Sequence, residues 1–338
     1  MKKLVAVLIL GAMVISASAQ KRELKFNEDG SFKVLQFTDI HMVAGMEDQQ
    51  AKVFARIRYA VNEEKPDLIA VTGDVVTGGR PCRPVLKNFL DTLDSYNIPF
   101  LIVFGNHDRE QDMTIPEMSS LIASCRNSIN TLNGDGILAD MRIPVASTDS
   151  KVPGLEIYAM DSHTSIQPGS TYEGKPIRYE WFTFDQVKWI RSEFQKSAKK
   201  YDCIVPSVAF FHIPLPEFLE AWQNTTESYF THNNVKGVRG EYGGHSRINS
   251  GMFAAMLEGG STMGVFCGHD HDSDFIVNHM GIALAYGRFS GEDTTYHHLL
   301  HGTRVIVFNQ GRREFKTWIR EDSGTISYYS DYADGVLR

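Results

Sequence analysis

The sequence predicts an α/β fold whose first half forms a parallel sheet, and two observations support this prediction. Short apolar runs rich in β-forming residues alternate with amphipathic segments of helical periodicity, an order typical of β-α-β units. These runs are apolar at nearly every position, as expected for strands that are buried on both faces. The run 100–104, Phe-Leu-Ile-Val-Phe, is the clearest of them.

The first half contains strands and helices in alternation. Strands are predicted at 32–37, 68–71 and 100–104, and helices at 48–64 and 85–96 lie between them. Helix 48–64 has Val53, Ile57 and Ala60 on one face, and Pro66 ends it. A further helix is predicted at 115–129. This order favours a parallel sheet with helices on its faces.

The second half is less regular and ends in a β-rich third. We expect a strand at 155–160, a helix at 184–200, a strand at 208–211, a long loop-like insertion at 215–247, a short helix at 248–258 and a strand at 264–267. Strands follow at 282–286, 304–308 and 315–319, and Gly311 suits a hairpin turn. Because there is no repeat or linker, residues 20–338 are predicted to form one domain.

The N-terminus has the pattern of a secretory signal peptide. Two lysines precede an apolar stretch of about a dozen residues and an Ala-x-Ala-like end, so cleavage is expected after Ala19. The stretch is shorter than the roughly 20 residues of a spanning helix, and no later stretch is apolar enough to span a membrane. We therefore expect an exported protein, periplasmic or secreted, that has no membrane span after cleavage.

Composition narrows the classes of partner. The formal charge is −7, and removal of the signal, with its two lysines, lowers it to about −9. An acidic chain is a poor nucleic-acid binder, although a bound metal ion allows it to handle phosphates. The four cysteines are widely spaced without a C-x-x-C pair, so they do not resemble a zinc site, and both disulfides and free thiols stay possible.

Polar motifs stand at the predicted ends of five strands. They are Asp39-x-His41, Gly73-Asp74, Gly105-Asn106-His107-Asp108, His212 and Gly268-His269-Asp270-His271. Asn, His and Asp are also ordinary loop residues, so one such motif is weak. Together the five supply carboxylate, imidazole and amide ligands, a set that suits Mn, Zn or Fe. Two such ions about 3.5–4 Å apart are what an in-line attack on phosphorus needs.

The order D-x-H, G-D, G-N-H-D, H, G-H-x-H resembles the calcineurin-like metallophosphoesterase superfamily over nearly the whole mature chain. Stretches 211–218, 249–251 and 268–272 look like the branch with plant purple-acid-phosphatase-like proteins and fungal phosphoprotein phosphatases, here in an exported form of bacterial type. The resemblance implies an α/β/β/α sandwich of two mixed sheets flanked by helices.

The resemblance also implies seven metal ligands in two groups that share a bridging carboxylate. The first group is Asp39, His41 and His271, the second is Asn106, His212 and His269, and the bridge is Asp74. The chemistry implied is hydrolysis of phosphate monoesters by a metal-bridging hydroxide. His107 would neutralise charge and protonate the leaving oxygen, and Asp108 would hold the His107 ring in the right tautomer.

One position departs from the true purple acid phosphatases, which have a tyrosine three residues after the bridging aspartate. That position is Thr77 here, so the site is expected to be colourless and need not contain ferric iron. The substrate is expected to be a phosphorylated small molecule or a phosphoprotein. A phosphodiesterase or nucleotide hydrolase on the same site, and a non-catalytic metal- or phosphate-binding protein, are the alternatives.

Several other side chains are weaker candidates. His163 follows a predicted strand, and Arg239 and His245 lie in the glycine-rich part of the insertion, where they would contact substrate. His297, His298 and His301 resemble a metal cluster, but we expect a surface loop there because the main site already has its ligands. We expect four aromatic residues to belong to the core rather than to a substrate platform, namely Trp181, Phe182, Phe184 and Trp189.

Overall fold

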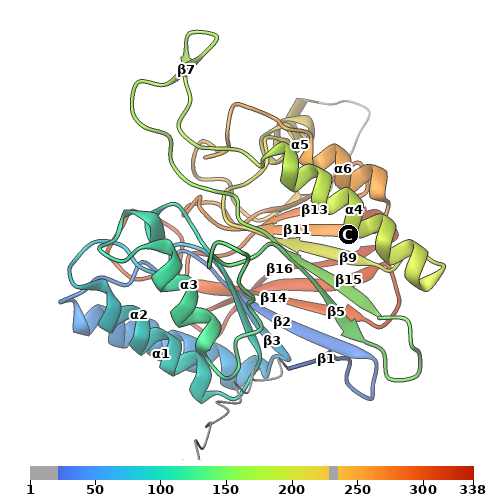
Figure 1. The fold of residues 1–338 in the computed structure, drawn as a ribbon, viewed down its shortest axis with the longest axis horizontal. Coiled ribbons are helices and arrows are strands. Elements are labelled where there is room, and N and C mark those ends of the chain that lie inside the picture. Colours follow the sequence, from blue (N-terminus) through green and yellow to red (C-terminus); the bar gives the residue numbers. More distant parts are fainter. Residues whose placement is uncertain (1–21, 228–234) are drawn as a thin grey trace, which may run out of the picture.

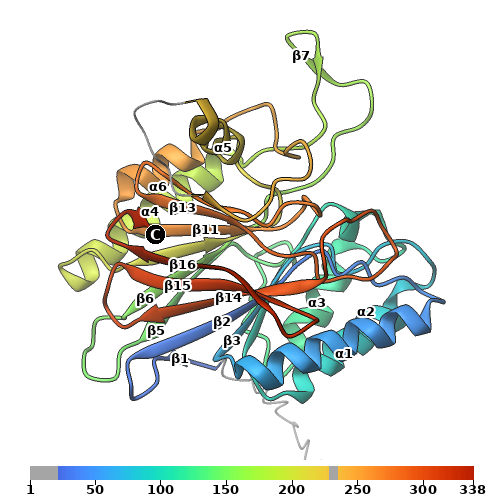
Figure 2. The same cartoon turned by 180° about the vertical axis from the view of Figure 1, so that it is seen from behind.

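Two large mixed sheets lie face to face in the computed structural model, and helices cover the outer face of each sheet (Figures 1 and 2). The structure describes residues 22–227 and 235–338. The predicted signal peptide, residues 1–19, lies outside the described residues. This arrangement is the expected α/β/β/α sandwich.

The first sheet has seven strands in the order β17-β16-β15-β14-β2-β3-β4. β2, β3 and β4 are parallel to one another, and the remaining pairs are antiparallel. The strands are β2 (Ser31–Phe37), β3 (Leu68–Thr72), β4 (Phe100–Val103), β14 (Gly302–Asn309), β15 (Glu314–Glu321), β16 (Ile326–Ala333) and β17 (Val336–Leu337).

The second sheet has eight strands in the order β1-β5-β6-β9-β11-β13-β12-β10, with β6, β9, β11 and β13 parallel. The strands are β1 (Leu24–Lys25), β5 (Met141–Ala146), β6 (Leu155–Ala159), β9 (Ser207–Phe210), β10 (Val235–Lys236), β11 (Thr262–Cys267), β12 (Ile276–His279) and β13 (Ile282–Tyr286). A small hairpin, β7 (Thr171–Tyr172) with β8 (Lys175–Pro176), projects from the body (Figure 1).

Three helices cover each sheet. α1 (Glu47–Glu64), α2 (Cys82–Ser95) and α3 (Ile115–Ser124) pack on the first sheet through one apolar cluster, and α4 (Phe184–Tyr201), α5 (Glu217–Glu227) and α6 (Met252–Gly259) pack on the second through another. A third apolar cluster fills the space between the sheets. Among the described residues, no helix is both long and apolar enough to cross a membrane.

The predicted helices and strands are present in the structure, but the predicted helix 115–129 ends at Ser124, and strands β12 and β16 were not predicted. Two further regions differ. The stretch 215–247 is not a continuous loop, because it includes α5, whose Phe218 and Ala221 are buried. Neighbouring prolines and a polar end hid the helical pattern of α5 in the sequence. Strand β5 was also missed, because Arg142 and Pro144 interrupt its alternation of apolar residues.

The parallel strands of both sheets end at one shared edge. In the first sheet Phe37 of β2 pairs with Val71 of β3, and Thr72 of β3 with Val103 of β4, so the three strands finish side by side. In the second sheet Phe210 of β9 pairs with Phe266 of β11. The loops after these strands therefore meet at one end of the sandwich, as open α/β sheets place their ligand sites.

The packing between the sheets depends on buried aromatic rings such as Phe266. Its ring centroid lies 5.3 Å from that of Phe210 in the same sheet and 5.7 Å from that of Phe315 in the other. We predict that Phe266→Ala lowers the free energy of unfolding by about 3–5 kcal/mol, measured by chemical denaturation, because it leaves a cavity between the sheets. The control Phe184→Ala, at a ring that is 77% exposed, should change it by less than about 0.5 kcal/mol. Equal effects of the two substitutions would contradict this account of the core.

Candidate active site

The candidate metal ligands lie directly after the strands that end at the shared edge. Asp39 and His41 follow β2, Asp74 follows β3, and His269 follows β11. These four residues have φ values between 49° and 80°, which non-glycine residues seldom adopt. Strain of this kind persists only where the surrounding structure holds it, and it is typical of functional sites.

The first group consists of Asp39, His41 and His271, which are all buried. The Nε2 atoms of the two histidines are 3.1 Å apart. Oδ1 of Asp39 lies 3.9 Å from Nε2 of His41 and 3.6 Å from Nε2 of His271. His271 uses its other nitrogen, Nδ1, to donate to the carbonyl oxygen of Tyr296 at 2.7 Å. That bond leaves Nε2 of the neutral His271 ring with its lone pair toward the group.

The second group consists of Asp74, His212 and His269, also buried, together with Asn106. Nε2 of His212 lies 3.1 Å from Oδ2 of Asp74 and 3.2 Å from both Oδ1 of Asn106 and Nδ1 of His269. Oδ2 of Asp74 is also 3.7 Å from Nε2 of His41 in the first group. Asp74 therefore lies between the two groups, where a bridging carboxylate is expected.

The donor set fits a pair of metal ions. Nδ1 of His212 donates to the carbonyl oxygen of Thr72 at 2.8 Å, so Nε2 of the neutral ring is an acceptor that faces further acceptors. Buried acceptors that face one another need a cation between them. Burial disfavours a charged ring, yet the carboxylate of Asp74 outweighs burial and raises the pKa of His212 to about 10. The site therefore strongly favours positive charge at this position.

Burial sets the charge state of the other ligands. It lowers the pKa of both His41 and His269 to about 3, so these rings are neutral and able to ligate. Burial opposes ionisation of Asp39 as well, but His271 and His212 outweigh it and hold the pKa of Asp39 at about 2. The carboxylates are thus ionised, as metal ligands must be.

Glycines allow the ligand loops to approach closely. A Cβ on Gly73, whose φ is +87°, would lie 2.5 Å from Nδ1 of His212. A Cβ on Gly268 would overlap the side chain of Thr38, next to Asp39. Larger residues at these positions would push the two sheets apart at the site.

The structure corrects the predicted role of Asp108. Its carboxylate accepts hydrogen bonds from the backbone N–H groups of Val75, Val76 and Gly105, at 2.9, 3.1 and 2.9 Å, rather than from the His107 ring. It therefore ties the loop after β3 to the loop after β4. A 3-10 turn over 107–110 turns the Asp108 side chain inward, and this turn was not apparent in the sequence.

Glu110 holds the His107 ring instead and was missed by sequence reasoning. Oε2 of Glu110 lies 2.7 Å from Nδ1 of His107, and the spacing of three residues was the signal that could have revealed the pair. The backbone N–H of His107 donates to Oδ1 of Asp74 at 2.8 Å, and the His107 and His41 ring centroids are 5.3 Å apart. His107 therefore lies at the rim of the site with its side chain partly exposed.

A cavity of about 510 Å³ opens beside the second group. His269 and Asp270 border it on the side of the metal ligands. Cationic and aromatic side chains also line it, namely Arg178, Arg247, Tyr179, Tyr242 and Tyr296. His245 also lines it, and the buried Nε2 of His245 has no hydrogen-bond partner within the described part of the chain. Its volume is in the range typical of small-molecule sites.

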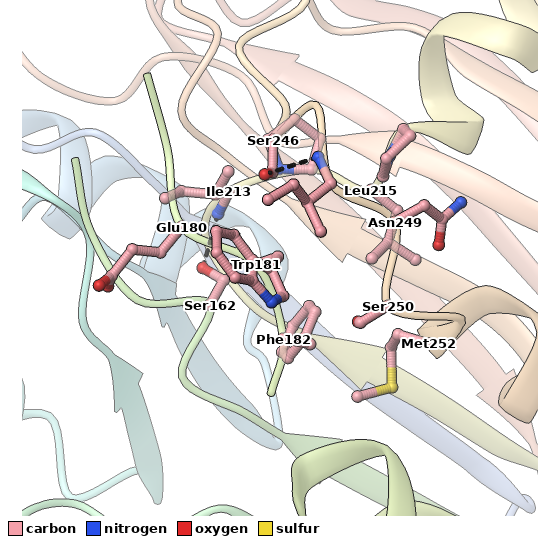
Figure 3. A pocket seen from close by; sticks show the side chains of 13 residues that line it. Ser162, Glu180, Trp181, Phe182, Ile213, Leu215, Ser246, Asn249, Ser250 and Met252 are labelled. Carbon is pink, nitrogen blue, oxygen red and sulfur yellow. Dashed lines mark hydrogen bonds between the residues drawn. The ribbon is translucent and has the colours of Figure 1, made fainter. Parts of the chain in front are cut away.

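The other weak candidates lie elsewhere. Arg239 is outside the lining of this cavity, with its guanidinium 5.8 Å from the ring of Tyr242. Nε2 of His163 is 2.7 Å from Oε1 of Gln186, in the first turn of α4. Trp181 and Phe182 line a separate hollow of only about 20 Å³, room for about one water molecule (Figure 3). Phe182 is buried in the core as expected, whereas Trp181 is only half-buried and the core prediction is wrong for Phe184, which is exposed.

Comparisons with known proteins agree with this site. The family described as calcineurin-like phosphoesterase matches residues 32–273. The chain is 30% identical to probable inactive purple acid phosphatase 29 of Arabidopsis thaliana, over 93% of this chain and 88% of that protein. It is 26% identical to phosphatase DCR2 of Saccharomyces cerevisiae, over 92% of this chain and 57% of that protein.

A dimetal phosphatase from Danio rerio has a similar fold, with a TM-score of 0.59 at 14% identity over 90% of this chain and 99% of that one. The matched residues include all five motifs, and their side chains meet at the shared sheet edge. The chain therefore belongs to the calcineurin-like phosphoesterase family.

Proposed function

We propose that this protein hydrolyses phosphate monoesters at the two ligand groups. The observation that supports the proposal most directly is the place of Asp74, within 3.1 Å of His212 and 3.7 Å of His41. A carboxylate between two buried groups of ligands can hold two cations close together. When bound, such ions supply positive charge for the phosphoryl oxygens and activate the attacking water.

The chain's own residues prepare the site for that reaction. Asp39, His41 and His271 would hold one ion, and Asn106, His212 and His269 the other. The backbone bonds of Asp108 fix the spacing of the loops that position Asp74 and Asn106. Because these groups are already in place and buried, little reorganisation accompanies the reaction.

His107 is proposed as the acid for the leaving group. Glu110 accepts a hydrogen bond from Nδ1, which orients the His107 ring and leaves Nε2 as the nitrogen that would donate a proton to the leaving oxygen. The partly exposed position of His107 at the rim gives it access to an ester bound at the two groups.

A non-catalytic binding protein is the second candidate, because three plant relatives are named probable inactive. The residues of this chain favour catalysis, since all seven proposed ligands converge and His107 has a partner that orients it. A protein that only bound phosphate would have no need of a positioned acid at the rim.

We predict that Asp74→Asn lowers turnover of p-nitrophenyl phosphate by about a hundredfold or more, because the substitution removes the charge between the two groups. The isosteric amide should preserve the fold, which circular dichroism checks. Mass spectrometry should show that the two ligand groups hold nearly two metal ions per chain in wild type and fewer in Asp74→Asn. The control Asp91→Asn, on the exposed side of α2, should keep wild-type values.

In the same assays the wild type should hydrolyse p-nitrophenyl phosphate faster than bis-p-nitrophenyl phosphate. The reverse order would favour the phosphodiesterase alternative. No turnover of either ester by wild type after addition of Mn, Zn or Fe, with phosphate still bound, would favour the binding protein.

We also predict that Glu110→Ala lowers kcat for the monoester by about 10- to 100-fold and leaves metal content unchanged, because it releases only the His107 ring. Asp108→Asn should instead reduce metal content, because it weakens the bonds that position Asp74 and Asn106. Glu63→Ala, an exposed acid on α1, is the control. Wild-type kcat in Glu110→Ala would show that Glu110 does not position the acid.

A further inference from the structure

A third cluster of possible metal ligands lies outside the candidate active site. It consists of Asp293, His297 and His301, which follow β13 in the segment 291–301. Nε2 of His297 lies 2.9 Å from Oδ1 of Asp293 and 3.2 Å from Nε2 of His301, and the remaining distance, from Oδ1 of Asp293 to Nε2 of His301, is 4.0 Å. Three ligand atoms from one short segment thus face one another.

The spacing matches that of the first ligand group in the same protein. There the corresponding distances are 3.1, 3.6 and 3.9 Å. Tetrahedral zinc with bonds of about 2.0–2.1 Å to nitrogen places neighbouring ligand atoms about 3.3 Å apart. The third cluster, at 2.9, 3.2 and 4.0 Å, is therefore close to the arrangement that a single zinc ion needs.

The rings of the cluster are held in place by an aromatic neighbour. The Phe289 ring centroid lies 4.8 Å from that of His297 and 5.8 Å from that of His301. The same ring lies 4.8 Å from that of His271 in the first group. Phe289 therefore separates the third cluster from the active site, so an ion there would be a distinct ion.

Burial and charge also suit a cation. The side chains of His297 and His301 are 14% and 18% exposed, and that of Asp293 is 63% exposed, so the cluster is open to water on one side. The charged neighbours of the cluster balance, with two acids, Glu292 and Asp322, and two cations, Lys52 and Arg56, so the charge of Asp293 itself is left over. The local excess of one negative charge favours a divalent ion.

We propose that Asp293, His297 and His301 bind a zinc ion, with water at the open fourth position. Two imidazoles and one carboxylate are a ligand set that zinc prefers, and three protein ligands with one open position are a known zinc geometry. Substitution of His297 or Asp293 would remove the ion without replacing any of the seven active-site ligands.

The position of the cluster gives this ion a structural role. Tyr296 lies between two of its ligands, and its carbonyl oxygen accepts the hydrogen bond from Nδ1 of His271. The Tyr296 ring also stacks on that of His271, with centroids 4.5 Å apart. An ion that holds Asp293 and His297 together therefore fixes the segment that orients His271.

The test compares the zinc content of the purified full chain with that of variants after equilibration with Zn²⁺ and removal of excess ion. His297→Ala and the isosteric Asp293→Asn should each contain one zinc per chain fewer than wild type. His298→Ala is the matched control, because its ring is 84% exposed and pairs with Asp272 outside the cluster. It should keep the wild-type zinc content.

The difference in zinc content between variant and wild type tests the third cluster, whereas the total zinc content of wild type tests the two active-site groups. If the active site held no zinc, wild type would still contain one ion and Asp293→Asn none. Equal zinc content in wild type and in a folded Asp293→Asn would overturn the proposal and leave a cluster joined by hydrogen bonds alone. Asp293 is largely exposed, so this variant is expected to fold, and circular dichroism verifies it.

Discussion

Buried acceptors that face one another at the meeting edge of two sheets are the constraint on which this structure depends. Asp39 and Asp74 are ionised and almost fully buried, and Nε2 of His271 lies 3.6 Å from Asp39 while Nε2 of His212 lies 3.1 Å from Asp74. Leaving such groups together without a cation would be costly. The fold is organised so that a cation can occupy this position, and the neighbouring residues prevent the groups from moving apart.

Three features of the fold maintain that arrangement. The parallel strands of both sheets end at one edge, so short loops are enough to bring ligands together. Gln36 links the sheets there, because its side-chain amide donates to Thr72 Oγ1 in one sheet and to the carbonyl oxygen of Cys267 in the other. Asp108 joins two ligand loops through backbone amides. The arrangement of the ligands thus depends on hydrogen bonds made by residues outside the ligand set.

The sequence predicted the site residues that lie directly after buried strands. Buried strands are recognisable by uninterrupted apolar runs, and the polar motifs after them could be expected to meet at the edge where parallel strands end. The choice of seven residues within these motifs as metal ligands came from the family resemblance. The partners of those ligands could not be predicted. Asp108 and Glu110 are both acids next to His107, and only the turn at 107–110 decides which of them contacts the ring.

The local backbone also decides which histidines meet in the segment 291–301, so the sequence alone could not show it. His297, His298 and His301 are equivalent in the sequence, but the backbone turns His298 toward Asp272 and brings Asp293 to the other two. Helix α5 was hidden for a different reason, since its few apolar residues follow two prolines. Side-chain direction in irregular segments depends on the tertiary structure, and residue spacing alone does not determine it.

Anomalous diffraction from crystals of the full chain grown with Mn²⁺ tests the central claim most directly. We predict two manganese peaks about 3.5–4 Å apart, one on each side of the Asp74 carboxylate. One peak should contact Asp39, His41 and His271, and the other Asn106, His212 and His269. A single peak, or none, at the shared sheet edge would contradict the assignment of a two-metal phosphoesterase site.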